Sequence, residues 1–115
     1  MLDLDPNAEV YCFDIDGTIC TEMVGDCENA QPIKSRISTI NQLYDRGATI
    51  YLMTARGMLG AENNQQVADE NMRELTETQL KEWGVSYHQL FFGKPRAMHY
   101  VDDKGWNDSD FFRQF

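Results

Sequence analysis

Apolar and polar positions fall in blocks along this chain, and the blocks predict strands that alternate with helices. Four short apolar runs are typical of strands, at Val10–Phe13, Ala48–Met53, Gln89–Phe92 and Met98–Val101. The second run is nearly continuous in apolar or β-favouring residues, which suits a strand covered on both faces. The pattern therefore predicts about four strands.

Two segments between these strands carry helical patterns. In the first, Pro32 suits the first helical position and Gly47 suits a left-handed stop. Its apolar stripe consists of Ile33, Ile37, Ile40 and Tyr44. The second segment carries a capping-box pattern at Thr76–Gln79 and ends at Gly84, and a start near Gln66 is the longer alternative.

The order strand, helix, strand, helix, strand predicts right-handed crossovers and a parallel sheet. We expect residues 1–115 to form a single α/β domain, with a three-layer α/β/α, Rossmann-like sheet of about four strands. Residues 17–31 and 57–65 are expected to be loops. The C-terminal aromatic residues are expected to pack back onto the sheet: Phe111, Phe112 and Phe115.

The composition is acidic, with a net charge of −9 over 115 residues. This balance opposes tight binding to a nucleic-acid backbone. Cys12, Cys20 and Cys27 lack metal-ligand pairing, so we interpret them as reduced thiols of a cytoplasmic protein, with Cys12 in the core. The acidic start at Met1–Pro6 predicts no signal peptide, and no apolar run approaches the about 20 residues of a membrane helix.

Polar side chains follow each of the four predicted strands. They are Asp14 and Asp16, then Thr54 and Arg56, then Lys94, then Asp102 and Asp103. Because the carboxyl ends of parallel strands meet at one edge of the sheet, we expect these groups to converge there. Clustered carboxylates need a counter-charge, and carboxylate and carbonyl ligands favour a hard ion such as Mg²⁺.

With these residues in this order, the chain resembles the haloacid dehalogenase superfamily of phosphatases. The Asp-x-Asp-Gly-Thr motif of that family is matched by Asp14–Thr18, and its later motifs by Thr54, Lys94 and Asp102-Asp103. Neither interval that carries a cap domain in relatives has room for one here. The resemblance implies a capless, haloacid dehalogenase-like hydrolase.

The resemblance also implies roles in phosphate-ester hydrolysis. Asp14 would be the nucleophile that forms an aspartyl-phosphate, and Asp16 would be the general acid and then the base. Mg²⁺ would be held by Asp14, the backbone carbonyl of Asp16, and Asp102. Lys94 would neutralise charge in the transition state.

The remaining candidates would bind the phosphoryl group or support its neighbours. Thr54 and the N–H groups near Gly17 and Ala55 would hold phosphoryl oxygens. Asp103 would orient Lys94 or a metal-bound water. Arg56 has two open interpretations, a grip on the leaving group or a pair with a surface acid.

A closer resemblance links the chain to small phosphatases of capsule and surface-polysaccharide biosynthesis. It rests on Thr54–Met58, Phe92–Pro95 and Tyr100–Lys104, with shorter matches between them. It implies a small phosphorylated sugar or related metabolite as substrate. An open site would also suit a homo-oligomer.

Other functions remain open at this stage. A polynucleotide 3′-phosphatase would share this core and a comparable Thr-x-Arg stretch, although the charge of −9 counts against it. A non-catalytic module that binds phosphate or metal is a different class of hypothesis. A phosphotransferase or mutase would pass the phosphoryl group to another acceptor.

Overall fold

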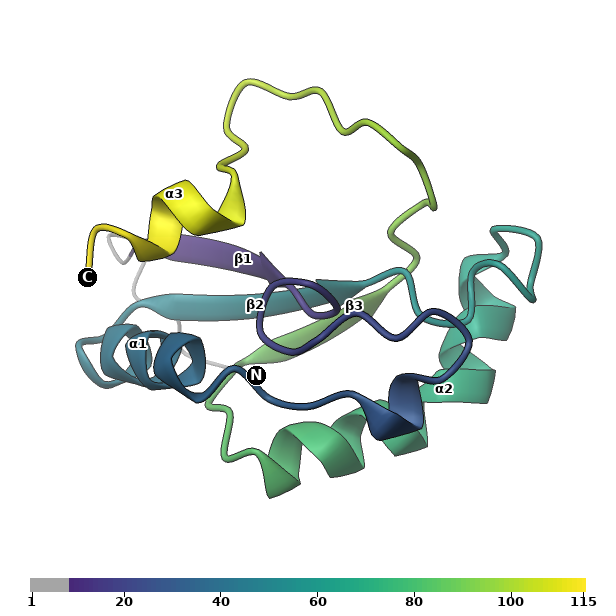
Figure 1. The fold of residues 1–115 in the computed structure, drawn as a ribbon, viewed down its shortest axis with the longest axis horizontal. Helices are drawn as coiled ribbons and strands as arrows, with labels where there is room; N and C mark the ends of the chain where they lie inside the picture. The colour runs from purple at the N-terminus through teal and green to yellow at the C-terminus, as the bar shows by residue number, and fades with distance from the viewer. Residues whose placement is uncertain (1–8) are drawn as a thin grey trace.

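The structure of the chain, a computed structural model, describes residues 9–115. Its centre is a parallel sheet in the order β1-β2-β3, formed by Val10–Asp14, Thr49–Thr54 and Gln89–Phe92. Helix α1 (Lys34–Asp45) connects β1 to β2, and α2 (Gln65–Glu82) connects β2 to β3 (Figure 1). A short 3₁₀ helix, η1 (Cys27–Asn29), precedes α1, and α3 (Asp108–Phe112) lies near the C-terminus.

The core lies on one face of the sheet. Strand register places Phe13 beside Leu52 and Leu52 beside Leu90, so these side chains share a face because strands alternate with a period of two. All three are buried in one cluster with Ile40 of α1 and Leu80 of α2. The expected parallel α/β fold is therefore present.

Few of residues 9–115 cover the opposite face of the sheet. Val10 and Phe91 are 58% and 43% exposed, and Cys12 is exposed as well. The three-layer arrangement expected from the apolar run of β2 is not formed by the described residues. The placement of Cys12 in the core was wrong, because the alternation that buries Phe13 turns Cys12 to the uncovered side.

The fourth expected strand is not formed either. Residues 93–107, here called the arch, run irregularly from β3 to α3 (Figure 1). Met98 and Val101 are 93% and 95% exposed. The chain turns back on itself instead of pairing, since the Tyr100 hydroxyl donates to the Pro95 carbonyl and the Lys94 ammonium lies 4.3 Å from the Tyr100 ring centre.

The helix boundaries confirm some expectations and correct two. Helix α1 begins at Lys34 and not at the expected Pro32, which pairs with Cys20 in an isolated bridge. Gly47 stops α1 with φ +97, as predicted. Helix α2 takes the longer alternative, because the Asn64 side chain caps it by accepting from the Val67 N–H. Thr76 therefore lies buried in mid-helix, and the capping-box interpretation was wrong.

The aromatic C-terminus packs back as expected for its two helical members. The rings of Phe111 and Phe112 lie 5.5 and 5.8 Å from the ring of Phe13. This contact holds α3 against the core and closes the arch at its far end. Between residues 9 and 115, no helix has the length and apolar character that a bilayer crossing requires.

Candidate active site

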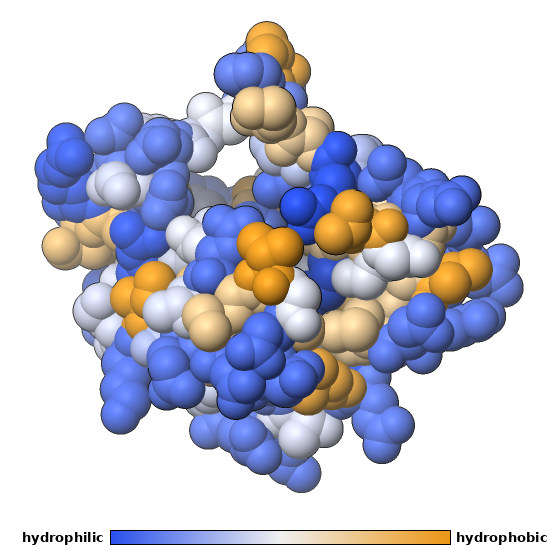
Figure 2. All heavy atoms as spheres, turned by 45° about the vertical axis from the view of Figure 1, so that its right-hand side comes forward, coloured by the Kyte–Doolittle hydropathy of each residue, from blue (hydrophilic) through white to orange (hydrophobic). Residues whose placement is uncertain are grey.

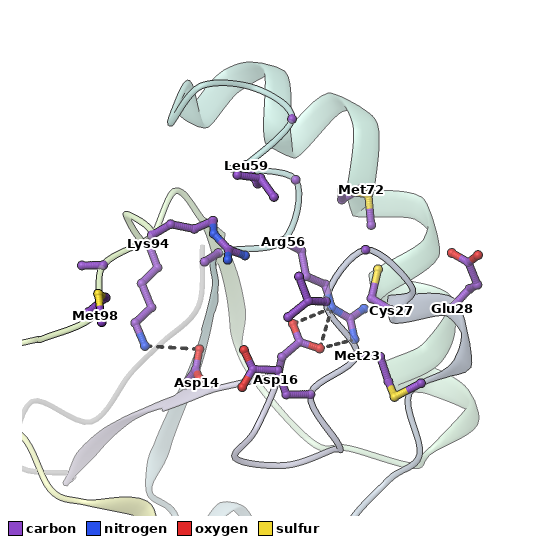
Figure 3. A pocket seen from close by; sticks show the side chains of 18 of the residues that line it. Asp14, Asp16, Met23, Cys27, Glu28, Arg56, Leu59, Met72, Lys94 and Met98 are labelled. Atoms are coloured by element: carbon purple, nitrogen blue, oxygen red, sulfur yellow. Dashed lines mark hydrogen bonds and ion pairs between the residues drawn. The ribbon is translucent and has the colours of Figure 1, made fainter.

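A pocket of about 720 Å³ opens beyond the carboxyl ends of the strands. Segments that follow all three strands line it, as the topology of a parallel sheet favours (Figure 3). Exposed apolar side chains from three loops stand at its rim: Met23, Val24, Leu59 and Met98. Figure 2 shows hydrophobic side chains scattered among hydrophilic ones on this side of the molecule.

Asp14 and Lys94 form an ion pair in this pocket. Lys94 Nζ lies 3.4 Å from Asp14 Oδ1, with side-chain exposures of 18% and 28% (Figure 3). Thr18 Oγ1 lies 3.5 Å from the other carboxylate oxygen. Burial raises the pKa of Asp14 above its usual value, and the charge of Lys94 offsets part of that rise.

The turn after β1 leads the chain from the sheet edge into a loop over the pocket. Gly17 has φ +82, a conformation that a side chain would strain, and its N–H donates to the Cys20 carbonyl at 2.9 Å. This N–H is therefore already engaged, although we expected it to hold a phosphoryl oxygen. Ala55 lines the pocket, and the buried Thr54 accepts the Arg56 N–H on its Oγ1 at 3.0 Å.

Arg56 pairs with an acid, but the acid is Asp16 of the pocket and not one at the surface. Its side chain is only 2% exposed, and its guanidinium donates to both carboxylate oxygens of Asp16, with Nε–Oδ2 at 2.9 Å and Nη2–Oδ1 at 3.0 Å (Figure 3). Burial alone would lower the pKa of Arg56, but the hydrogen bond and charge of Asp16 raise it overall. The fork thus fixes the plane of the Asp16 carboxylate.

Two further residues of this cluster were missed in the sequence. Arg56 Nη1 also donates to Thr76 Oγ1 at 3.2 Å and to Gln79 Oε1. Both acceptors are buried on α2. The only sequence signal was a pair of polar residues on the apolar side of a helix, and the capping-box interpretation had accounted for them.

Asp102 and Asp103 lie in the arch, away from the pocket lining. Both are exposed; Asp102 accepts the Lys104 N–H and Asp103 pairs with the Lys104 ammonium at 3.1 Å. Their expected convergence with Asp14 required the fourth strand, which is not formed. The structure therefore brings Asp14, Asp16, Arg56 and Lys94 together but not the two acids of the arch.

This arrangement does not fit a divalent cation. Within residues 9–115, no group of three or more His, Cys, Asp or Glu side chains could hold a metal ion. Asp14 is paired with Lys94, and Asp16 is engaged by Arg56. A hard cation prefers several oxygen ligands, so no chemical step below passes through a metal.

Neither a protein-family model nor a curated protein sequence matches the chain. A crystal structure of a Vibrio cholerae protein, whose name states no activity, is 26% identical with a TM-score of 0.82, over 90% of this chain and 87% of that one. A structure of the Pnkp1/Rnl/Hen1 complex is 15% identical with a TM-score of 0.57, over 86% of this chain and 33% of that one.

A D,D-heptose 1,7-bisphosphate phosphatase from B. bronchiseptica, crystallised with magnesium and phosphate, is also similar. It is 15% identical with a TM-score of 0.50, over 84% of this chain and 54% of that one. The chain has a haloacid dehalogenase-like fold. At 15% identity the likeness to the Pnkp1/Rnl/Hen1 complex and to the heptose bisphosphate phosphatase concerns the fold and not the activity.

Proposed function

We propose that the chain is a phosphomonoester hydrolase that acts through an aspartyl-phosphate on Asp14. One observation carries the proposal: a half-buried carboxylate at the end of β1 faces a pocket with an ammonium group 3.4 Å away. Such a pair provides a nucleophile beside a fixed positive charge, which an attack on a phosphate ester requires.

The residues suggest a two-step reaction. A carboxylate oxygen of Asp14 attacks phosphorus, and the bond from phosphorus to the ester oxygen breaks. Asp16 enters this step protonated and gives its proton to the released alcohol, and the carboxylate that it becomes is bound by the Arg56 guanidinium. Asp16 then removes a proton from water, whose oxygen attacks phosphorus and breaks the bond to Asp14. Lys94 offsets the charge on the phosphoryl oxygens, and inorganic phosphate is released.

Magnesium remains an expectation from the sequence resemblance and not a part of this mechanism. Its expected ligand Asp102 lies in the exposed arch. Binding of Mg²⁺ by Asp14 and Asp102 together would require the arch to change its conformation. The dependence of hydrolysis on Mg²⁺ is therefore a separate test, described below.

The substrate we propose is a sugar phosphate or a similar small metabolite. The pocket of about 720 Å³ suits a small molecule, and the charge of −9 opposes an extended nucleic acid. The rim adds apolar contacts through Leu59 and Val24 and one cationic side chain, Arg96. A cytoplasmic location and homo-oligomer formation remain predictions.

The test compares purified protein on p-nitrophenyl phosphate, a panel of sugar phosphates, and a 3′-phosphorylated oligonucleotide. We expect release of phosphate from the first two, with a higher kcat/KM on the best sugar phosphate than on the oligonucleotide. A preference for the oligonucleotide would favour the polynucleotide 3′-phosphatase alternative. Phosphate transfer to an added alcohol in place of water would indicate a phosphotransferase.

A further inference from the structure

The cluster around Arg56 is a buried polar network that the proposed chemistry leaves unexplained. A guanidinium with a 2% exposed side chain is costly to desolvate unless its donors are satisfied. Here Nε and Nη2 of the guanidinium donate to Asp16, and Nη1 donates to Thr76 and Gln79 of α2. A single arginine therefore joins the end of β1 to the middle of a helix.

Gln79 extends this network to the wall of the pocket. Its Oε1 accepts from Arg56, and its Nε2 donates to the Cys27 carbonyl at 2.8 Å. Because Gln79 is 5% exposed, both halves of its amide are used in the interior. A continuous chain of hydrogen bonds thus runs from Cys27 through Gln79 and Arg56 to Asp16.

Cys27 belongs to a loop that covers the pocket. Residues 21–31, here called the flap, are closed at their base by two hydrogen bonds between Thr21 and Gln31, each of 2.9 Å. All flap residues from Glu22 to Glu28 except Asp26 line the pocket. The amide of Gln79 is therefore a point where the flap is fastened to the body of the protein.

We propose that Arg56 and Gln79 are positioning residues that couple the place of the flap to the orientation of the Asp16 carboxyl group. When the flap is seated, Gln79 holds the guanidinium, and the guanidinium holds Asp16 in the plane it needs for proton transfer. When the flap opens, Gln79 loses its Cys27 contact and Arg56 loses a fixed partner. The coupling to catalysis rests on the proposed hydrolase function, whereas the fastening of the flap does not.

The first test uses Gln79→Met, which keeps the length of the side chain and removes both amide contacts. An ester with a poor leaving group, such as glycerol phosphate, needs the acid more than p-nitrophenyl phosphate does. We expect kcat to fall roughly 10–100-fold on the poor leaving group and only about 3-fold on the good one, because a misplaced acid loses most where it is needed most. Gln66→Met, the same change at an exposed position of α2, is the matched control.

Two conservative variants separate the halves of the network. Gln79→Glu keeps an acceptor for Arg56 but cannot donate to the Cys27 carbonyl, so we expect leaving-group discrimination to recover while the flap stays loose. Arg56→Lys keeps the charge but loses the planar guanidinium that bonds both oxygens of Asp16. We therefore expect kcat on the ester with the poor leaving group to fall as in Gln79→Met. Arg46→Lys, the same substitution at an exposed position, is the matched control.

The second test does not need activity. Hydrogen exchange of the flap amides between Met23 and Glu28 should quicken about 10-fold in Gln79→Met and Gln79→Glu, which lose the bond to the Cys27 carbonyl, and stay near the wild-type rate in Arg56→Lys and in both controls. Inactive wild-type protein would reject the proposed hydrolase while this exchange result still decides whether the network fastens the flap. Unchanged exchange, or equal slowing of both esters in Gln79→Met, would overturn the coupling. If Gln79→Met does not fold, Arg56→Lys takes its place in the comparison of esters, and Gln79→Glu takes its place in the exchange measurement.

Discussion

The cluster around Arg56 and the arch both contain polar residues that follow apolar segments, and only the cluster around Arg56 is packed. In the cluster around Arg56, the residues Arg56, Thr76 and Gln79 are buried, and Arg56 contacts both Asp16, which follows β1, and helix α2. The arch carries Asp102 and Asp103 in full contact with solvent, bonded only to neighbouring Lys104 among the described residues. The sequence predicted that Asp16, Arg56 and the two acids of the arch would all lie at the same edge of the sheet.

The difference lies in what surrounds each pair. Asp16 follows β1, whose backbone pairs with β2 at five positions. The backbone pairing therefore fixes the position of Asp16 without help from side-chain contacts. Asp102 follows a four-residue apolar run that pairs with no described strand. A charged group is placed by the elements that flank it, and a motif without a paired strand leaves its acids in solvent.

The largest expected effect comes from the nucleophile. Asp14→Asn should lower hydrolysis of p-nitrophenyl phosphate at least ~10³-fold, because an amide does not form the acyl phosphate. Steady-state kinetics measure the loss. Asp45→Asn, an exposed change at the end of α1, should leave the rate unchanged. Full activity of the Asp14 variant would remove this residue from the mechanism.

The next largest loss of activity is expected at Lys94, the residue of the arch that pairs with Asp14. Lys94→Met should lower kcat/KM about 10²-fold, since it removes a fixed charge at the phosphoryl group. Lys104→Met, in the exposed arch, is the control and should change little.

The same variant carries a pH prediction. Asp14 must be ionised to attack, and burial raises its pKa above the ordinary 3.8, so activity should fall as pH drops through that raised value. Because Lys94 lowers the pKa of Asp14, Lys94→Met should shift the acid limb of the kcat/KM profile to higher pH. An acid limb that does not move would contradict the electrostatic link between the two residues.

A fourth prediction tests whether the arch can join the site. If Mg²⁺ binds through Asp14 and Asp102, the arch must move, and the 63% exposed Trp106 should change its fluorescence on titration. In that case Asp102→Asn should weaken the apparent Mg²⁺ affinity at least ~10-fold, as loss of a carboxylate ligand does. Asp110→Asn is the control. Unchanged Trp106 emission together with full hydrolysis in EDTA would mean that the arch does not join the site and that hydrolysis does not depend on Mg²⁺.

The smallest effects compare the stability of the two regions. Thr76→Val keeps its shape but removes an acceptor from the buried Arg56, which should cost about 1 kcal/mol of the free energy of unfolding. Met98→Ala in the arch should change it by less than about 0.5 kcal/mol, because the side chain is 93% exposed. Urea denaturation measures both. Equal losses would mean that the arch is packed in solution.

The parts of the fold that follow local rules were predictable from the sequence. The three paired strands, the glycine stop after α1 and the packing of Phe111 and Phe112 all follow from periodicity and turn chemistry. The uncovered sheet face was not predictable, because apolar residues in β2 do not tell how many layers cover them. The exposed position of Cys12 follows from that same missing layer.

The candidate site shows the same division. Asp14, Asp16 and Lys94 could be placed because each lies at or just after the end of a strand that pairs in the sheet. The partner of Arg56 could not, since sequence spacing does not reveal which of 19 acidic residues will meet a given arginine. Thr76 and Gln79 were missed because their polar atoms face inward to a charge supplied by another segment.

The uncovered face of the sheet also offers a chemical handle on the protein. Cys12 is exposed on it, whereas Cys20 is buried with a pKa raised to about 12 by burial first and the charge of Asp16 second. Cys12 is two residues before Asp14 and does not line the pocket. A maleimide dye should therefore label Cys12 in preference to Cys20, and would report on the end of β1 from outside the pocket.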